Sequence, residues 1–104
     1  VNALKGQVGQ TNYCAAKAGL IGFVKALALE NAAKEITVNA IAPGYTSTDM
    51  VSAIDEAVLS KIIETIPAKR LATPEEIADS VAYLISDKAS YINGTTLHIN
   101  GGMY

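Results

Sequence analysis

Residues 36–44 read ITVNAIAPG, and this stretch decides the fold class. The run over residues 36–42 is short, apolar and rich in β-branched side chains, and Pro43-Gly44 stops it. Such a run predicts a strand that is buried on both faces, and strands of this kind belong to parallel sheets. Residues 96–100, TLHIN, predict a second strand, which Gly101-Gly102 closes.

A long helix is expected before the first strand. Residues 12–34 carry apolar side chains at helical spacing. Because only Lys17 and Lys25 are charged between residues 14 and 29, this helix is apolar nearly all round and needs cover on two sides. A sheet provides one cover, and we expect the same helix of a second subunit to provide the other.

Two further helices are expected between the strands. A mobile loop at residues 45–50 is followed by a weaker helical pattern over residues 51–65, which we interpret as a lid-like helix. Residues 73–76, TPEE, then place a capping residue, a proline and two acids at the start of a helix that extends to about Ser86. The expected buried stripe of this last helix consists of Ile77, Val81, Leu84 and Ile85.

The element order therefore supplies only two strands, and both need parallel partners. A two-stranded parallel sheet has no independent stability. The sequence predicts an α/β fold, specifically the C-terminal half of a doubly wound, Rossmann-type parallel-sheet domain that occupies residues 1–104. We expect the N-terminal half upstream of Val1, because the first residues show neither an initiator Met nor a signal-peptide pattern.

Composition excludes several classes of protein. The 104 residues carry 8 Lys plus Arg against 10 Asp plus Glu, so the net charge of −2 argues against nucleic-acid binding through a basic surface. The apolar runs are too short for a membrane span. Cys14 is the single cysteine, and no His or Cys pair has metal-ligand spacing, so we expect no disulfide, no metal and a reducing compartment.

Tyr13 and Lys17 form the first candidate for chemistry. Their spacing of four places both side chains on one helix face, with Cβ atoms within about 6 Å. A phenol has a pKa of about 10, and a neighbouring ammonium favours the phenolate and lowers that pKa. Tyr13 would then act as a general acid. Spacing alone also fits an ordinary pair on a helix surface.

Three segments in order resemble the short-chain dehydrogenase/reductase family. They are NYCAAKAGL at 12–20, ITVNAIAPG at 36–44 and LHINGG at 97–102. Within the family, KGQVGQTNY at 5–13 and IPAKRL at 66–71 are most similar to reductases of 3-oxoacyl thioesters, those acting on acetoacetyl-CoA in particular. The resemblance covers essentially the whole chain. It implies NADPH-dependent reduction to the 3-hydroxyacyl thioester, in the cytoplasm, by a homo-oligomer that is a tetramer in this family.

The resemblance also implies residue roles. Tyr13 would protonate the carbonyl oxygen while the nicotinamide delivers hydride, and Lys17 would bind the ribose hydroxyls and lower the pKa of Tyr13. The other positions that match cofactor contacts are Pro43, Gly44, Thr46 and Thr48, and those that border the acyl thioester are Gln7, Gln10 and Tyr45. Thr46 stands where these reductases usually carry a large aliphatic residue, and Ala72 stands where many carry glycine.

Other interpretations stay open. One is reduction of the acyl-carrier-protein thioester in fatty acid synthesis, and another is a sugar or steroid alcohol dehydrogenase on the same scaffold. The third is a truncated, non-catalytic oligomerisation fragment. The family's catalytic serine, about 13 residues before the tyrosine, and its glycine-rich dinucleotide loop would both precede Val1. We therefore expect the isolated fragment to be inactive, and we interpret Cys14, His98, Glu75 and Glu76 as structural.

Overall fold

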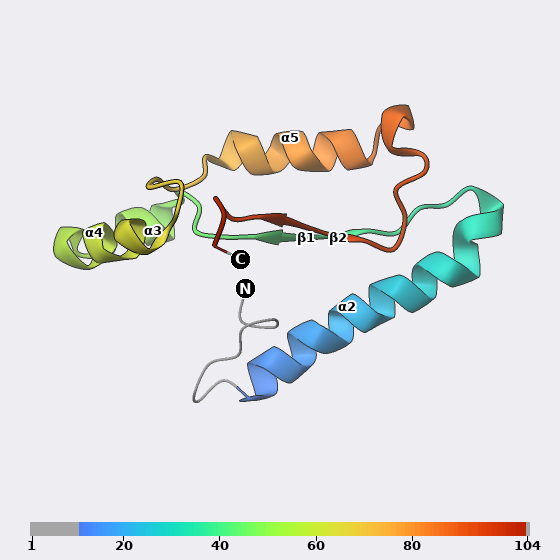
Figure 1. Cartoon of the computed structure of the whole chain (residues 1–104), viewed down its shortest axis with the longest axis horizontal. Helices are drawn as coiled ribbons and strands as arrows, with labels where there is room; N and C mark the ends of the chain where they lie inside the picture. Colours follow the sequence, from blue (N-terminus) through green and yellow to red (C-terminus); the bar gives the residue numbers. More distant parts are fainter. Residues whose placement is uncertain (1–10, 104) are drawn as a thin grey trace.

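The computed structural model describes residues 11–103, in which a parallel sheet lies between two helices (Figure 1). The strands are β1 (Ala40–Pro43) and β2 (Thr96–Ile99), with Ala40 opposite Thr96 and Pro43 opposite Ile99. Helix α5 (Pro74–Leu84) runs along one side of the sheet, and α2 (Thr11–Asn31) lies obliquely on the other side, with its N-terminal end away from the strands. The predicted α/β class and parallel strand pair are confirmed.

Strand β1 begins four residues later than the apolar run predicts. Before Ala40, asparagine side chains form hydrogen bonds with the segment that leads into β2. Asn39 Nδ2 donates to the carbonyl of Ile92 at 3.0 Å, and Asn39 Oδ1 accepts from the amide of Thr95 at 3.1 Å. The amide of Val38 donates to Asn93 Oδ1 at 2.9 Å. Residues 38 and 39 are therefore held by these side-chain bonds and by the amide of Gly94, which donates to the carbonyl of Val38 at 2.8 Å, and the predicted strand start at Ile36 was wrong.

Helix α2 confirms the long helix, and the short 3₁₀ helix η1 (Ala32–Lys34) continues it. Val24 and Ala28 are buried, and Asn93 Nδ2 donates to the carbonyl of Ala28 at 3.4 Å. On its other faces, Phe23 is 60% exposed and Leu29 is 82% exposed. Only one apolar stripe of α2 is thus covered by residues 11–103.

The single lid-like helix expected over residues 51–65 was wrong. The structure has two pieces, α3 (Asp49–Ser52) and α4 (Glu56–Thr65). Thr48 caps α3 through its side chain, and Asp55 adopts an extended ψ of 134° just before α4. Asp and Thr favour helix caps over helix interiors, because their short polar side chains compete for backbone hydrogen bonds.

Helix α5 begins where the sequence predicts it. Thr73 Oγ1 accepts from the amide of Glu76 at 3.1 Å, and Glu76 Oε1 accepts from the amide of Thr73 at 2.9 Å, which makes a capping box around Pro74. The helix ends at Leu84, followed by the short η2 (Asp87–Ala89). The expected buried stripe was wrong: Ile85 is the C-cap and is 81% exposed, Val81 is 38% exposed, and Ile77 and Leu84 are only half-buried.

The described residues leave much apolar surface uncovered. An open groove of about 540 Å³ lies between residues 37–41 and the C-terminal part of α5. Val24, Ala28, Ile66 and Ala89 are the buried apolar residues within 11–103. The radius of gyration is 15.7 Å, against about 13 Å for a compact domain of this length. Neither face of β1 or β2 is fully buried, because two strands and two helices do not close a core.

Candidate active site

The carboxyl ends of the strands gather most of the predicted site residues. In open parallel sheets, ligands bind beyond the carboxyl ends of the strands. Figure 1 shows α3 and α4 at this end of the sheet, and α2 runs antiparallel to the strands, so its N-terminal end points the same way. The segment after β1 and the first turns of α2 are therefore presented toward one end of the molecule.

Tyr13 and Lys17 lie on one face of α2. The Nζ atom of Lys17 lies 5.5 Å from the centroid of the Tyr13 ring, which is within the range of a cation–π contact. Tyr13 is 49% exposed, and Lys17 is exposed as well. At 3.6 residues per turn, the pair shares its stripe with the buried Val24 and Ala28. The stripe that is buried against the turn at Asn93-Gly94 thus continues into an accessible phenol beside an ammonium.

The turn after β1 is held close to the end of β2. The amide of Gly44 donates to the carbonyl of Ile99 at 2.8 Å. A Cβ atom on Gly44 would lie 2.9 Å from both Cα and Cβ of Asn100, closer than real Cβ contacts allow. Glycine is therefore required where Pro43 leads out of β1, because Asn100 fills the space that a side chain would need.

Thr46 and Thr48 place two hydroxyls on the segment that follows. Thr46 Oγ1 donates to the carbonyl of Gly44 at 3.1 Å, so this hydroxyl proton serves the turn itself. Thr48 Oγ1 accepts from the amide of Val51 at 3.3 Å as the cap of α3. A hydroxyl that accepts in this way keeps its own proton to donate. Thr48 can therefore donate to an anionic group at this end of the sheet.

Ala72 pairs with the segment after β1, a contact that the sequence did not predict. Thr46 and Ala72 form an isolated parallel bridge, in which the amide of Ala72 donates to the carbonyl of Tyr45 at 3.0 Å. The amide of Ser47 donates to the carbonyl of Ala72 at 2.8 Å. A single isolated backbone bridge leaves no periodic pattern, so the sequence carries no signal for it.

Arg70 and Glu76 make a bidentate ion pair next to this bridge. Arg70 Nη1 lies 2.7 Å from Glu76 Oε1, and Arg70 Nη2 lies 2.9 Å from Oε2. The hydrogen bond from Arg70, followed by that from the Thr73 amide, lowers the pKa of Glu76 to about 2. The same bond raises the pKa of Arg70 above its ordinary value. A Thr followed three residues later by Glu is the signal that could have placed Glu76 in a capping box.

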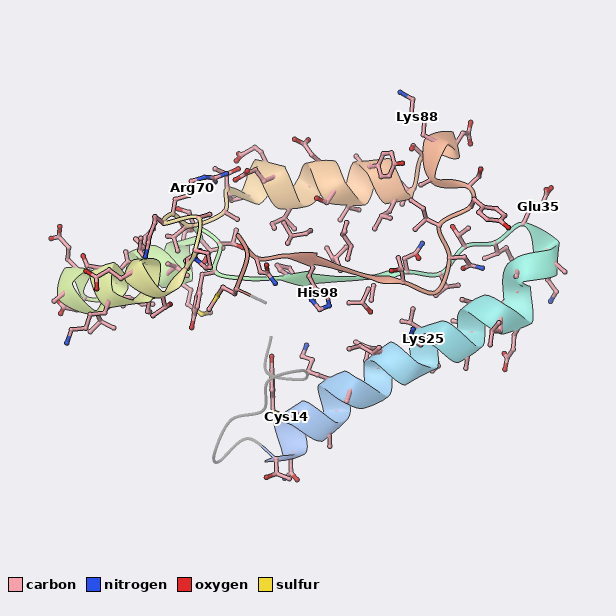
Figure 2. All side chains as sticks on the ribbon, viewed as in Figure 1. Cys14, Lys25, Glu35, Arg70, Lys88 and His98 are labelled. Carbon is pink, nitrogen blue, oxygen red and sulfur yellow. The ribbon has the colours of Figure 1, made fainter. Side chains whose placement is uncertain are left out.

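The remaining predicted residues are placed as follows. Gln7 and Gln10 lie outside the described residues, and Tyr45, the third residue expected to border the substrate, is exposed beside the bridge. Figure 2 shows His98 extending from β2 toward the side of α2, and Cys14 at the N-terminal end of that helix.

Within residues 11–103, no cluster of three or more metal-ligating side chains occurs. No helix in the same range has the length and apolar character needed to cross a membrane.

Comparison with known proteins gives matches along the chain. A family model described as "Enoyl-(Acyl carrier protein) reductase" matches residues 1–104. The chain is 60% identical over 103 residues to "Nodulation protein G" of Azospirillum brasilense and 58% identical over 104 residues to "Acetoacetyl-CoA reductase" of Acinetobacter sp. (strain RA3849). It is 54% identical over 99 residues to "3-oxoacyl-[acyl-carrier-protein] reductase FabG" of Haemophilus influenzae.

These matches cover nearly all of the chain but less than half of each relative. They include 99%, 100% and 95% of the chain, respectively. The corresponding shares of the relatives are 42%, 42% and 41%. The chain therefore spans about two fifths of the length of the curated relatives it matches.

Proposed function

The chain belongs to the short-chain dehydrogenase/reductase family, and from that membership we propose that the whole protein reduces a 3-oxoacyl thioester to the 3-hydroxyacyl thioester with NADPH. In this proposal residues 1–104 are the C-terminal part of one dinucleotide-binding reductase domain. Relatives at 54% to 58% identity are named as reductases of such thioesters. The accessible Tyr13–Lys17 pair on the first turns of α2 is the observation that carries the proposal.

Tyr13 acts as the general acid in this mechanism. The nicotinamide supplies a hydride to the carbonyl carbon when it is bound. The Tyr13 hydroxyl gives its proton to the carbonyl oxygen, which completes the new alcohol and leaves a phenolate. The positive charge of Lys17 next to the ring stabilises that phenolate. Because Tyr13 is half exposed, it regains a proton from solvent.

The residues present fit a dinucleotide cofactor. Lys17 offers three N–H donors on an accessible face of α2, which suit ribose hydroxyls. Pro43 and Gly44 would meet the nicotinamide side of the cofactor through the turn after β1, whose conformation is supported by the hydrogen bond from Thr46 Oγ1 to the carbonyl of Gly44. Thr48 keeps a hydroxyl proton for a phosphate oxygen. Family members use NAD(H) or NADP(H), and our choice of NADPH follows the resemblance to the thioester reductases.

Acetoacetyl-CoA is the proposed substrate, and the carrier-protein thioester is the second candidate. The second is favoured by relatives that carry its name at 54% and 57% identity, close to the 55% to 58% of the acetoacetyl-CoA reductases. Tyr45 is exposed beside the turn and, with Gln7 and Gln10, would border the acyl group.

We place the protein in the cytoplasm as a homo-oligomer, with a tetramer as in the family. Acyl thioesters of CoA and reduced nicotinamide cofactors are made inside cells, which supports this location. The uncovered Phe23 and Leu29 on α2 support a subunit contact along that helix. A non-catalytic assembly module, the alternative from another class, would use the same uncovered residues of α2 but would bind no cofactor.

Steady-state kinetics of the intact protein test the proposal. NADPH oxidation is followed with acetoacetyl-CoA and with the acetoacetyl carrier protein, and NADH replaces NADPH in parallel. We expect the higher kcat/KM with acetoacetyl-CoA and NADPH. A large preference for the carrier protein supports the second candidate, and absence of turnover with both substrates and both cofactors overturns the reductase proposal.

A further inference from the structure

Arg70 and Glu76 lie close to the proposed cofactor segment, although neither belongs to it. Figure 2 shows Arg70 at the N-terminal end of α5, on the side of α3 and α4. The pair is bidentate, at 2.7 and 2.9 Å, and Arg70 Nη1 also donates to the carbonyl of Leu71 at 3.2 Å. The guanidinium therefore ties the loop over residues 70–72 to the first turn of α5.

Glu76, which accepts from Arg70, also belongs to the capping box at the start of α5. Glu76 Oε1 accepts from the amide of Thr73, while Thr73 Oγ1 accepts from the amide of Glu76. One carboxylate thus receives three hydrogen bonds, two from Arg70 and one from Thr73. Arg70, Thr73 and Glu76 make a closed frame around Leu71 and Ala72.

Ala72 connects this frame to the proposed cofactor segment. Its amide donates to the carbonyl of Tyr45, and its carbonyl accepts from the amide of Ser47, so both bonds flank Thr46. Gly44, two residues earlier, is held against the end of β2. The segment is therefore fixed on one side by the sheet and on the other by the loop that the ion pair holds.

We propose that Arg70 and Glu76 are positioning residues for cofactor binding, which act through Ala72 on the segment 44–48. Neither side chain touches the cofactor in this proposal. The pair restricts the segment to the conformation that meets the nicotinamide side of the cofactor, so that less conformational freedom is lost on binding. This inference rests on the proposed function, because it assumes that the segment contacts a nicotinamide cofactor.

Fluorescence titration of the intact protein with NADPH tests the inference. Arg70→Ala is expected to raise the Kd for NADPH about three- to tenfold, while kcat with acetoacetyl-CoA at saturating NADPH stays within about twofold. Arg70→Lys, which keeps the charge but loses the bidentate geometry, should give a smaller rise. The double variant Arg70→Ala/Glu76→Gln should match Arg70→Ala, because the two residues act as one unit.

Two control variants separate positioning from a general loss of stability. Glu75→Gln removes one carboxylate charge, as Glu76→Gln does, but at the preceding residue. Within residues 11–103 the Glu75 carboxylate has no hydrogen bond or ion pair. Ser86→Ala removes a 2.6 Å hydrogen bond to Tyr83 near the opposite end of α5. Both should leave the Kd for NADPH unchanged, whatever they do to the melting temperature.

The outcomes separate this inference from the function it rests on. An unchanged Kd in Arg70→Ala and Arg70→Lys, with normal wild-type binding and turnover, overturns the positioning role and leaves the reductase proposal standing. An equal rise in Kd for Ser86→Ala also overturns it, since the effect would then follow stability. A wild-type protein that binds no nicotinamide cofactor overturns the proposed function and this inference with it.

Discussion

Among single residues, Lys17 and Gly44 are central to the proposed site. The spacing of four between Tyr13 and Lys17 predicts their proximity, because helix geometry alone sets which side chains meet. The close approach of Gly44 to Asn100 could not be predicted in the same way. It joins residues 56 positions apart in the sequence, and only the packing of β1 beside β2 creates it.

Lys17→Ala should weaken NADPH binding by about tenfold or more, because charge-assisted hydrogen bonds to the ribose would be lost. Titration of the intact protein with NADPH measures this change. Lys25→Ala is the matched control, since Lys25 is an exposed lysine two turns further along α2. Equal affinities of wild type and Lys17→Ala would remove Lys17 from the cofactor site.

Gly44→Ala should destabilise the protein by about 1–3 kcal/mol, the usual cost of forcing an atom into a well-packed place. The new Cβ would meet Cα and Cβ of Asn100 at 2.9 Å, and a backbone atom cannot rotate away. Urea denaturation of the intact protein gives the free energy of unfolding. A variant as stable as the wild type would show that the two turns move apart freely.

At the scale of elements, predictions succeeded where local signals were strong. The start of α5 follows from Thr73 and Pro74, and the length of α2 follows from its apolar side chains at helical spacing, which outweigh the low helix propensity of Gly19 and Gly22. The break between α3 and α4 was missed because the apolar periodicity over residues 51–65 outweighed the capping preference of Asp55. The late start of β1 was missed because the hydrogen bonds of Asn39 depend on distant residues.

Because of the Arg70–Glu76 pair, the stability of the folded protein should depend on pH, and the direction of this dependence follows from the pKa of Glu76. The pKa of Glu76 is lowered to about 2 from an ordinary value of 4.5. At pH values between these two, the unfolded chain binds a proton that the folded chain does not, so the contribution of Glu76 to stability falls as the pH falls. Above about pH 5 the contribution is complete.

Wild type should therefore melt at a higher temperature than Glu76→Gln at neutral pH. The difference in melting temperature should shrink as the pH drops from about 4.5 toward 2, because the wild-type carboxylate then gains its proton. Thermal melts of the intact proteins between pH 7 and 3 measure it, with Glu75→Gln as control. A constant difference over this range would contradict the assigned pKa shift.

At the scale of the whole molecule, the described residues do not form a continuous hydrophobic core. The radius of gyration of 15.7 Å and the open groove between β1 and α5 both show surfaces that lack cover. The sequence predicts this need, because a two-stranded parallel sheet and a helix that is apolar all round both require further partners. What covers each surface could not be predicted, since apolar surface is not specific for its partner.

The isolated 104-residue chain should unfold without a cooperative transition and should not oxidise NADPH. Too little apolar area is removed from water to offset the conformational entropy of ordering the chain. Calorimetry and the absorbance of NADPH in the presence of acetoacetyl-CoA measure the two properties. A sharp melting transition or measurable turnover would contradict this expectation.

The most direct test of the account is the kinetics of Tyr13→Phe in the intact protein. This change keeps the ring and its contact with the Lys17 ammonium, and it removes only the hydroxyl that carries the proton. We predict that kcat with acetoacetyl-CoA and NADPH falls by about 10²- to 10⁴-fold, while the Kd for NADPH stays within about twofold. A variant that retains the wild-type kcat would contradict the claim that Tyr13 protonates the substrate.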